Sequence, residues 1–195
     1  MTTMTHDEIG EFAAERMKKK GYPMVWANMR SIAVGEQPDV MAFKSMYDCV
    51  IIEVKVSRSD FLADKKKPWR NGTVNGMGTE RVYLTPPNLL KPSEIPFGWQ
   101  LWEVHEQKSR TIIKVIKGMK KGKVLSWNKE RMEDGWVYPN CEPGEIYHFR
   151  KTHNIESVSN WLVVVMRRIA QTGIDVSLFG NCEHMKSLGF YSDEA

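Results

Sequence analysis

The sequence has few of the features that mark a secreted or membrane-bound protein. Only three cysteines occur among 195 residues, and their wide spacing matches no disulfide framework. The N-terminus has no apolar run of the kind found in signal peptides. The longest apolar stretch, residues 161–166, is far too short to cross a bilayer. These absences predict a cytoplasmic protein with no membrane partner.

Familiar zinc and phosphate-binding motifs are also missing. The cysteines and histidines of the C-terminal half lack the paired spacing of structural zinc ligands. The basic run of residues 114–123 resembles a phosphate-binding loop only superficially. One residue too few separates its glycines, and Val124 stands where Ser or Thr is required. A hairpin turn is the simpler interpretation of this run.

The composition is that of one ordinary globular domain. Hydrophobic residues make up 42% of the chain and charged residues 27%, and a chain of this length can bury a stable core. The 28 lysines and arginines outnumber the 24 acidic residues, which gives a net charge of +4. This balance permits a polyanionic partner but does not require one.

Hydrophobic periodicity predicts an α/β fold, a mixed sheet flanked by helices. A helix comes first, three strands follow, and Ser57 then caps a second helix that leads to another strand. The expected helices begin near residues 7 and 57, and the expected strands cover residues 24–34, 38–43, 47–56, 81–85, 99–104 and 111–115.

We expect residues 1–117 to form this core and residues 118–195 to form a C-terminal extension. Residues 118–144 have little periodicity. Residues 156–171 have apolar side chains along one side of a helix, and we expect this helix to pack on the core.

Two charged residues interrupt the most apolar of the expected strands. Glu53 and Lys55 are two positions apart, so they project from the same face of the strand. A short turn after the preceding strand would bring Asp39 close to Glu53. Buried charges are rare unless they are paired or bind a metal, so these three residues predict a reaction centre.

The residue types suit phosphodiester hydrolysis. Asp39 and Glu53, with the carbonyl of Val54 and some waters, would form an oxygen-rich site for Mg²⁺ or Mn²⁺. The metal would neutralise the phosphate and activate a water. Lys55 would position that water or stabilise the transition state.

The same residues carry a resemblance to a known family. Pro38-Asp39 followed by Glu53-Val54-Lys55 matches the signature of the PD-(D/E)XK nucleases. The run of residues 57–65 resembles the corresponding segment of MmcB-like DNA repair proteins and related phage proteins, and the resemblance extends over residues 5–105. It implies a restriction-endonuclease-like αβββαβ core and DNA as the substrate.

The resemblance also implies a further acidic residue from the first helix. Glu8, Glu11 and Glu15 are the candidates. Glu8 and Glu15 flank the apolar stripe, and Glu15 is favoured between them. The alternative interpretation is that all three belong to a solvated helix face.

A basic run follows the second helix and ends at a glycine-rich loop. We expect Lys65, Lys66, Lys67 and Arg70 to contact the DNA backbone and Trp69 to stack on a base. The alternative is a solvated helix end.

Simpler explanations remain open for the reaction centre as well. Glu53 and Lys55 could form an ion pair on an edge strand, and Asp39 could be a turn residue.

The chain could also be a nuclease-fold module that binds DNA without cutting it, or a phage or bacterial regulator that binds a protein. Its oligomeric state is open, with a homodimer as one alternative.

Overall fold

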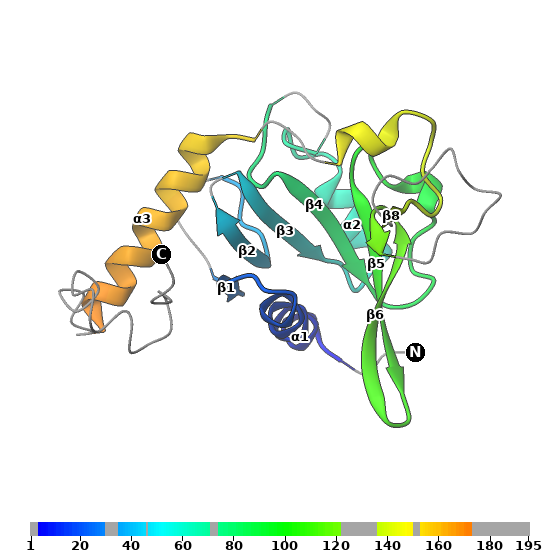
Figure 1. The fold of residues 1–195 in the computed structure, drawn as a ribbon, viewed down its shortest axis with the longest axis horizontal. Helices are drawn as coiled ribbons and strands as arrows, with labels where there is room; N and C mark the ends of the chain where they lie inside the picture. The colour runs from blue at the N-terminus through cyan, green and yellow to red at the C-terminus, as the bar shows by residue number, and fades with distance from the viewer. Residues whose placement is uncertain are drawn as a thin grey trace, which may run out of the picture.

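A six-stranded mixed sheet forms the centre of the molecule, and helices cover it (Figure 1). The computed structural model describes residues 4–29, 35–45, 47–70, 74–121, 136–149 and 153–172. The α/β class expected from the sequence is confirmed. The elements are α1 (His6–Lys19), β1 (Met24–Ala27), β2 (Val40–Ser45), β3 (Asp48–Val54), α2 (Arg58–Asp64), β4 (Glu80–Thr85), η1 (Pro92–Glu94), β5 (Gln100–Gln107), β6 (Arg110–Lys117), β7 (Lys120–Lys121), β8 (Trp136–Val137), η3 (Glu145–His148) and α3 (Ile155–Gln171).

The strands of the large sheet lie in the order in which they occur along the chain. Strands β1, β2 and β3 are antiparallel neighbours, and so are β5 and β6. In the middle, β3, β4 and β5 run parallel, and α2 lies in the crossover between β3 and β4. The first six elements therefore follow the expected order of helix, three strands, helix and strand.

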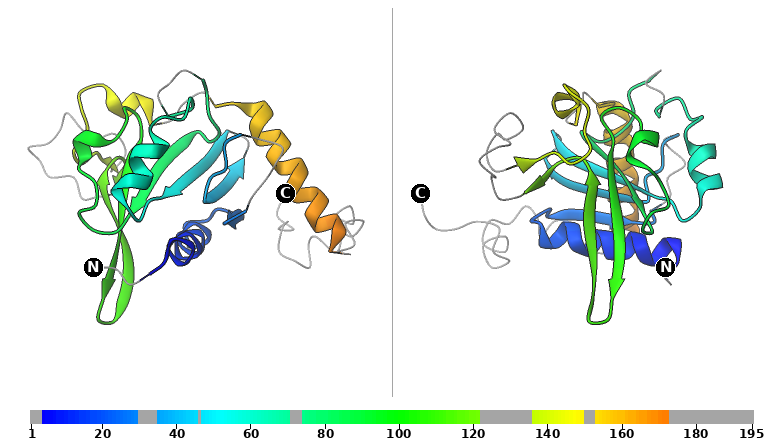
Figure 2. Two further views of the ribbon diagram at one scale, coloured as in Figure 1. Left: turned by 180° about the vertical axis from the view of Figure 1, so that it is seen from behind. Right: turned by 90° about the vertical axis from the view of Figure 1, so that its right-hand side faces the viewer.

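Both faces of the sheet are buried, because helices pack on each of them (Figure 2). On one face, Ile9 and Met17 of α1 pack against the strands. On the other face, Phe61 of α2 and Trp161 of α3 do so. Successive strand residues point to opposite faces, so the helices bury alternate positions of β3. This explains why the central strands are apolar almost throughout.

Local sequence signals explain where α1 and α2, the two helices beside the catalytic candidates, begin. A capping box begins α1: Thr5 Oγ1 accepts a hydrogen bond from the Glu8 N–H, and the Glu8 carboxylate accepts one from the Thr5 N–H. Glu8 is therefore a capping residue. Ser57 caps α2 as expected, because its hydroxyl accepts a hydrogen bond from the Asp60 N–H at 3.2 Å.

The first strand is shorter than its apolar pattern predicts. Strand β1 ends at Ala27, whereas the expected strand covers residues 24–34. Asn28 has a φ of 53°, a left-handed conformation that interrupts an extended chain. Residues 30–34 lie outside the described residues, as do 71–73 of the glycine-rich loop.

The last two strands of the sheet are longer than expected and form a hairpin that extends beyond the sheet (Figure 1). The apolar patterns at residues 99–104 and 111–115 mark only the parts that lie against the core. Polar side chains continue both strands toward the turn, where backbone pairing between Gln107 and Arg110 holds them together.

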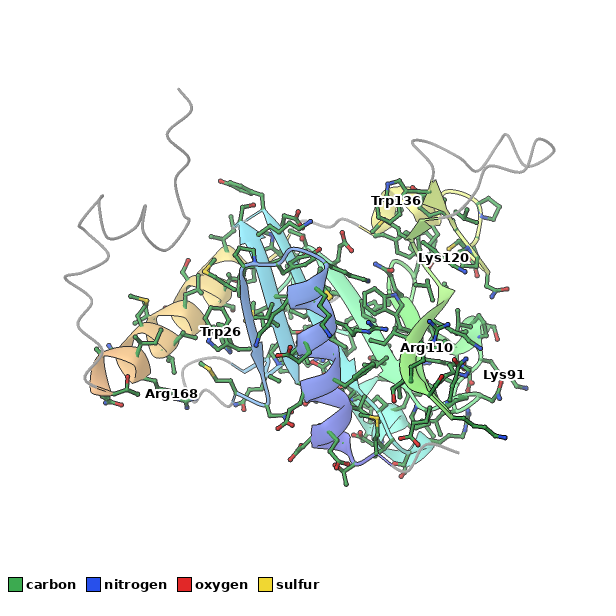
Figure 3. All side chains as sticks on the ribbon, turned by 60° about the horizontal axis from the view of Figure 1, so that its bottom comes forward. Trp26, Lys91, Arg110, Lys120, Trp136 and Arg168 are labelled. Atoms are coloured by element: carbon green, nitrogen blue, oxygen red, sulfur yellow. The ribbon has the colours of Figure 1, made fainter. Side chains whose placement is uncertain are left out.

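Helix α3 covers the outer part of one sheet face, as expected for residues 156–171. Trp161 packs edge-on against Trp26 at a centroid distance of 5.3 Å and lies 6.0 Å from Phe43. Trp26 lies between the sheet and α3 (Figure 3). Among the described residues, no helix combines the length and the apolar character needed to span a membrane. The boundary at residue 118 stays a prediction.

Candidate functional site

Glu53 and Lys55 lie at the end of β3, in the middle of the sheet. Their side chains are buried, with exposed fractions of 2% and 5%. Lys55 Nζ lies 3.5 Å from Glu53 Oε2, so both side chains are on the same face, as the alternation along a strand predicts. Because β2 and β4 flank β3, an ion pair on an edge strand is excluded.

Asp39 immediately precedes β2 and is held against the end of β3. Val40 pairs with Ile52, and the same antiparallel register continued by one residue places Asp39 opposite Glu53. Asp39 Oδ2 accepts a hydrogen bond from the Val54 N–H at 2.7 Å. The side chain therefore bonds to the neighbouring strand, which a simple turn residue would not do.

A buried arginine binds the carboxylates around this pair. Arg70 is 4% exposed. Its Nη2 lies 2.6 Å from Glu53 Oε1 and its Nε lies 2.7 Å from Asp64 Oδ2, while Nη1 contacts Glu36. The prediction that Arg70 contacts the DNA backbone is corrected, because its guanidinium is enclosed by protein carboxylates.

Asp64 is the second unexpected member of this network. It is 1% exposed and accepts a hydrogen bond from the Tyr83 hydroxyl at 2.8 Å. Lys67 Nζ lies 2.6 Å from its other oxygen. Burial alone would raise the pKa of Asp64, but the Arg70 guanidinium and the hydrogen bonds from Lys67 and Arg70 lower it to about 2. Asp64 is therefore an ionised, structural carboxylate and not the surface residue that its position in the sequence suggests.

The protonation states of the central pair follow from these surroundings. Burial alone would lower the pKa of Lys55, but the carboxylates of Glu53, Asp64, Asp60 and Asp39 raise it, so Lys55 stays protonated. Burial raises the pKa of Glu53 to about 7, against the opposing effect of the nearby cations. Glu53 can thus gain or lose a proton near neutral pH.

The first helix brings a histidine to the site and not a glutamate. The Glu15 side chain is 58% exposed and pairs with Lys18 at 2.9 Å. It is therefore directed to solvent and not to the site, contrary to the expected catalytic role. Instead, His6 Nε2 lies 3.3 Å from Asp39 Oδ2. Burial alone would lower the pKa of His6, but the hydrogen bond with Asp7 and the charge of Asp39 raise it.

The expected nucleic-acid contacts after α2 differ in accessibility. Lys65, Lys66 and Lys67 are exposed, and a contact between these lysines and phosphate stays a prediction. Trp69 is half-buried, with its ring against Gly35, so only part of the ring can face a base.

A divalent cation at this site would have few protein ligands. Glu53 Oε1 is buried and lies 2.6 Å from Arg70 Nη2, so a cation would share this oxygen with the guanidinium. Within the described ranges, no group of three or more His, Cys, Asp or Glu side chains could hold a metal by itself. Mg²⁺ often uses one or two carboxylates and completes its shell with water and substrate phosphate. Asp39 and Glu53 could form such a site, with the Val54 carbonyl as the expected further ligand.

Sequence reasoning missed His6, Glu36 and Tyr83, and it favoured a surface position for Asp64 over support of Lys55. Asp64 follows the Ser57 cap in a pattern that reads equally well as a helix surface. Glu36 lies in a loop, and no spacing relates it to its partners, the Arg70 guanidinium and the Met77 N–H. His6 begins α1, where an N-terminal helix residue gives no catalytic signal of its own.

Comparison with known proteins finds a similar solved structure but no similar sequence. No family model and no curated protein sequence matches the chain. Among solved structures, the SPO1766 protein of unknown function from Silicibacter pomeroyi is similar, with 13% sequence identity and a TM-score of 0.46. The alignment covers 89% of this chain and 94% of that chain.

Proposed function

We propose that the protein is a Mg²⁺- or Mn²⁺-dependent nuclease that hydrolyses phosphodiester bonds in DNA. The observation that supports this most is the buried pair of Glu53 and Lys55 in a central strand, with Asp39 held beside it. Burying such charges costs several kcal/mol per ion, and apolar side chains would fill a purely structural position at less cost. The match of these three residues to the PD-(D/E)XK signature supports the same conclusion.

Each residue has a distinct role in this proposal. Asp39 and Glu53 would bind the cation, which when bound neutralises phosphate charge and activates water. Lys55 keeps its proton because nearby carboxylates raise its pKa, so it donates a hydrogen bond and does not act as a base. His6 orients Asp39 through the contact of 3.3 Å.

A cleavage assay tests the proposal. Single- and double-stranded DNA are incubated with the protein in Mg²⁺, Mn²⁺ or EDTA. We expect cleavage only with a metal, and a loss of roughly 100-fold or more in Glu53→Gln and Lys55→Met, in line with the loss of a group that acts on the reacting atoms. Glu15→Gln is the matched control, since this carboxylate is exposed and pairs with Lys18. Metal-independent cleavage, or full activity in Glu53→Gln, would contradict the proposal.

One observation favours a second candidate, a nuclease-fold module that binds DNA without cutting it. Arg70 already compensates the Glu53 carboxylate at 2.6 Å, so a cation has to compete with the guanidinium. This candidate predicts equal DNA binding in EDTA and Mn²⁺ with no cleavage in either. The regulator hypothesis predicts no DNA binding at all, so the cleavage assay together with a DNA-binding measurement in EDTA and in Mn²⁺ separates the three.

A further inference from the structure

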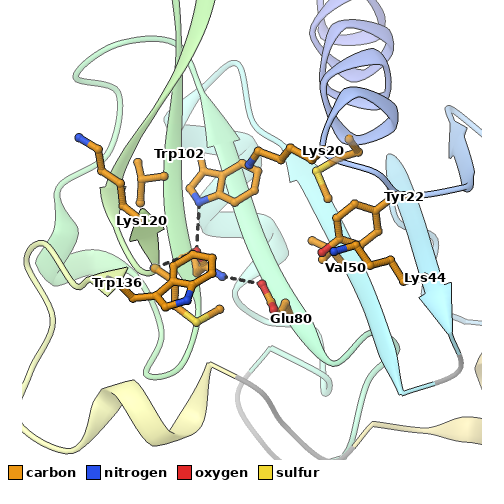
Figure 4. Close-up of a pocket in the computed structure, with 12 residues that line it drawn as sticks. Lys20, Tyr22, Lys44, Val50, Glu80, Trp102, Lys120 and Trp136 are labelled. Atoms are coloured by element: carbon orange, nitrogen blue, oxygen red, sulfur yellow. Dashed lines mark hydrogen bonds between the residues drawn. The ribbon is translucent and has the colours of Figure 1, made fainter. Parts of the chain in front are cut away.

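Polar contacts hold both ends of helix α1 to the sheet. At its C-terminal end, Lys20 Nζ lies 4.3 Å from the ring centroid of Trp102 in β5, beside a cavity of about 500 Å³ (Figure 4). At its N-terminal end, Asn28 Nδ2 donates a hydrogen bond to the Asp7 carbonyl at 3.2 Å. The two ends of α1 are therefore fixed by separate contacts.

Asn28 also binds the backbone of Asp39. Ala27 pairs with Val40, and the same register continued by one residue places Asn28 opposite Asp39. The Asn28 N–H donates a hydrogen bond to the Asp39 carbonyl at 2.7 Å. With a φ of 53°, Asn28 adopts the left-handed conformation, which asparagine tolerates better than most residues do. One residue therefore joins the backbone of Asp39 to the first turn of α1.

Gly10 in the second turn of α1 makes room for the Asn28 side chain. A Cβ at this position would lie 2.9 Å from Asn28 Oδ1, closer than Cβ atoms approach their neighbours in proteins. Glycine disfavours the interior of a helix, and the close approach of another segment is one reason for its use there. The fit of Gly10 against Asn28 therefore sets how closely α1 approaches the end of β1.

The first turn of α1 also supports the Asp39 side chain. His6 Nδ1 lies 3.0 Å from Asp7 Oδ1, and its Nε2 lies 3.3 Å from Asp39 Oδ2. The Val54 N–H donates a hydrogen bond to the same oxygen at 2.7 Å. Both contacts use Oδ2, which leaves Oδ1 of Asp39 as the oxygen for a cation.

We propose that Asn28, fitted against Gly10, is a positioning residue for Asp39 in the metal-dependent reaction. It holds the first turn of α1 in place, so that His6 and Val54 fix one oxygen of Asp39 and the other is presented to the cation. This inference rests on the proposed nuclease function, in which Asp39 is a metal ligand. Residues that orient a metal ligand strengthen metal binding without touching the metal.

Amide hydrogen exchange in the metal-free protein, followed by NMR, tests the positioning. The Val54 N–H reports on Asp39, because Asp39 Oδ2 accepts its hydrogen bond, and the Ile52 N–H in the same strand is the reference. Asn28→Gly keeps the left-handed backbone and removes the side chain. We expect it to raise the ratio of the Val54 to the Ile52 exchange rate by at least about fivefold, because loss of the α1 anchor frees Asp39 from His6.

Binding of Mn²⁺ measures the consequence for the metal. Electron paramagnetic resonance detects free Mn²⁺ in a titration without DNA, and we expect the dissociation constant to rise about tenfold in Asn28→Gly. The KM for DNA in the cleavage assay at saturating Mn²⁺ should change by less than about twofold, because a positioning residue acts on the metal ligand and not on the DNA contacts.

A double variant tests the fit between Gly10 and Asn28. Gly10→Ala alone should also weaken Mn²⁺ binding about tenfold, since the added methyl group displaces the Asn28 side chain. Its addition to Asn28→Gly should cause no further loss, because no side chain is then left to displace. Independent losses that multiply to about a hundredfold would contradict the proposed fit.

Two further variants serve as controls. Asn140 is also exposed and left-handed, with a φ of 52°, and its Nδ2 donates a hydrogen bond at 2.7 Å to the Ile116 carbonyl in β6, at the opposite edge of the sheet from β1. Asn140→Gly therefore matches Asn28→Gly in kind and should change neither the exchange ratio nor Mn²⁺ affinity. Lys20→Ala removes only the contact at the C-terminal end of α1 and should also leave the exchange ratio unchanged.

Two outcomes would overturn the assignment. One is an unchanged exchange ratio in a folded Asn28→Gly variant. The other is a rise in KM for DNA with no change in Mn²⁺ affinity, which would show that Asn28 contacts DNA in the cavity of about 210 Å³ that it borders with Asp39. A wild-type protein that binds no Mn²⁺ contradicts the proposed nuclease, and the exchange ratio, measured without metal, still decides whether Asn28 positions Asp39.

Discussion

Asp64 links the end of α2 to the charged groups of the central strands. Its two oxygens receive the Tyr83 hydroxyl, the Arg70 guanidinium and the Lys67 ammonium, all within 2.8 Å. Removing one partner from a buried ionic network lowers the stability of the fold, because the remaining charges stay buried without compensation. The network therefore makes the stability of the fold depend on the ionisation of Asp64.

This dependence predicts a specific effect of pH. Because the pKa of Asp64 in the folded protein is lowered to about 2, its contribution is present above the unfolded value of 3.8 and is lost as pH falls through about 2. The shift corresponds to roughly 2 kcal/mol. We expect Asp64→Asn to lower the free energy of unfolding by about this amount at pH 7, and the difference from wild type to shrink toward pH 2. Urea unfolding across this range measures it.

Asp60 provides the control for this experiment. It lies on the same helix, but its side chain is 45% exposed and lies 3.7 Å from Lys55 Nζ. Asp60→Asn should change stability by no more than about 0.5 kcal/mol. A constant difference between wild type and Asp64→Asn from pH 7 to pH 2 would show that Asp64 acts through packing and not through its charge.

The sequence alone indicates Asp39, Glu53 and Lys55, because charges in an apolar strand and an acid before its neighbour are local patterns. Arg70 could not be assigned in this way. A lysine run precedes it in the chain, and only the fold turns its guanidinium inward to Glu36 and Glu53. The same limit applies to Glu15, since helical periodicity does not say which flank of α1 faces the end of β3.

At the scale of elements, α3 joins the core through a small number of large side chains. Val158, Trp161 and Val165 are buried, whereas Val163 and Met166 on the same helix are about half exposed. This is the narrow apolar stripe that the sequence shows in residues 156–171. The length and the packing side of α3 were therefore predictable. The elongated β5–β6 hairpin was not, because its outer residues are polar and backbone pairing continues both strands beyond the apolar pattern.

Trp161 should carry most of the attachment of α3 to the sheet. Trp161→Ala removes contacts with Trp26 and Phe43 and should lower the free energy of unfolding by about 3–5 kcal/mol. Val163 on the same helix is 47% exposed, so Val163→Ala should lower the free energy of unfolding by less than about 1 kcal/mol. Chemical denaturation of both variants measures the difference. Equal effects would mean that α3 contributes helix propensity and not packing.

At the scale of the whole molecule, Glu53 and Lys55 lie on the face of the sheet that α2 and α3 cover. The net charge of +4 is too small to attract DNA uniformly, so the distribution of lysines has to direct binding. Lys67 connects the exposed lysines after α2 to the catalytic candidates through Asp64.

This distribution predicts how salt affects DNA binding. Replacing Lys65, Lys66 and Lys67 by Ala should weaken binding and reduce the slope of log K against log salt by about 0.9 for each lost phosphate contact on double-stranded DNA. A matched variant replaces Lys19, Lys108 and Lys114, which are exposed elsewhere. Both variants lower the net charge from +4 by three units. Fluorescence anisotropy from 50 to 200 mM salt measures the slopes. Equal losses in the two variants would mean that total charge, and not the lysines beside Asp64, governs the contact with DNA.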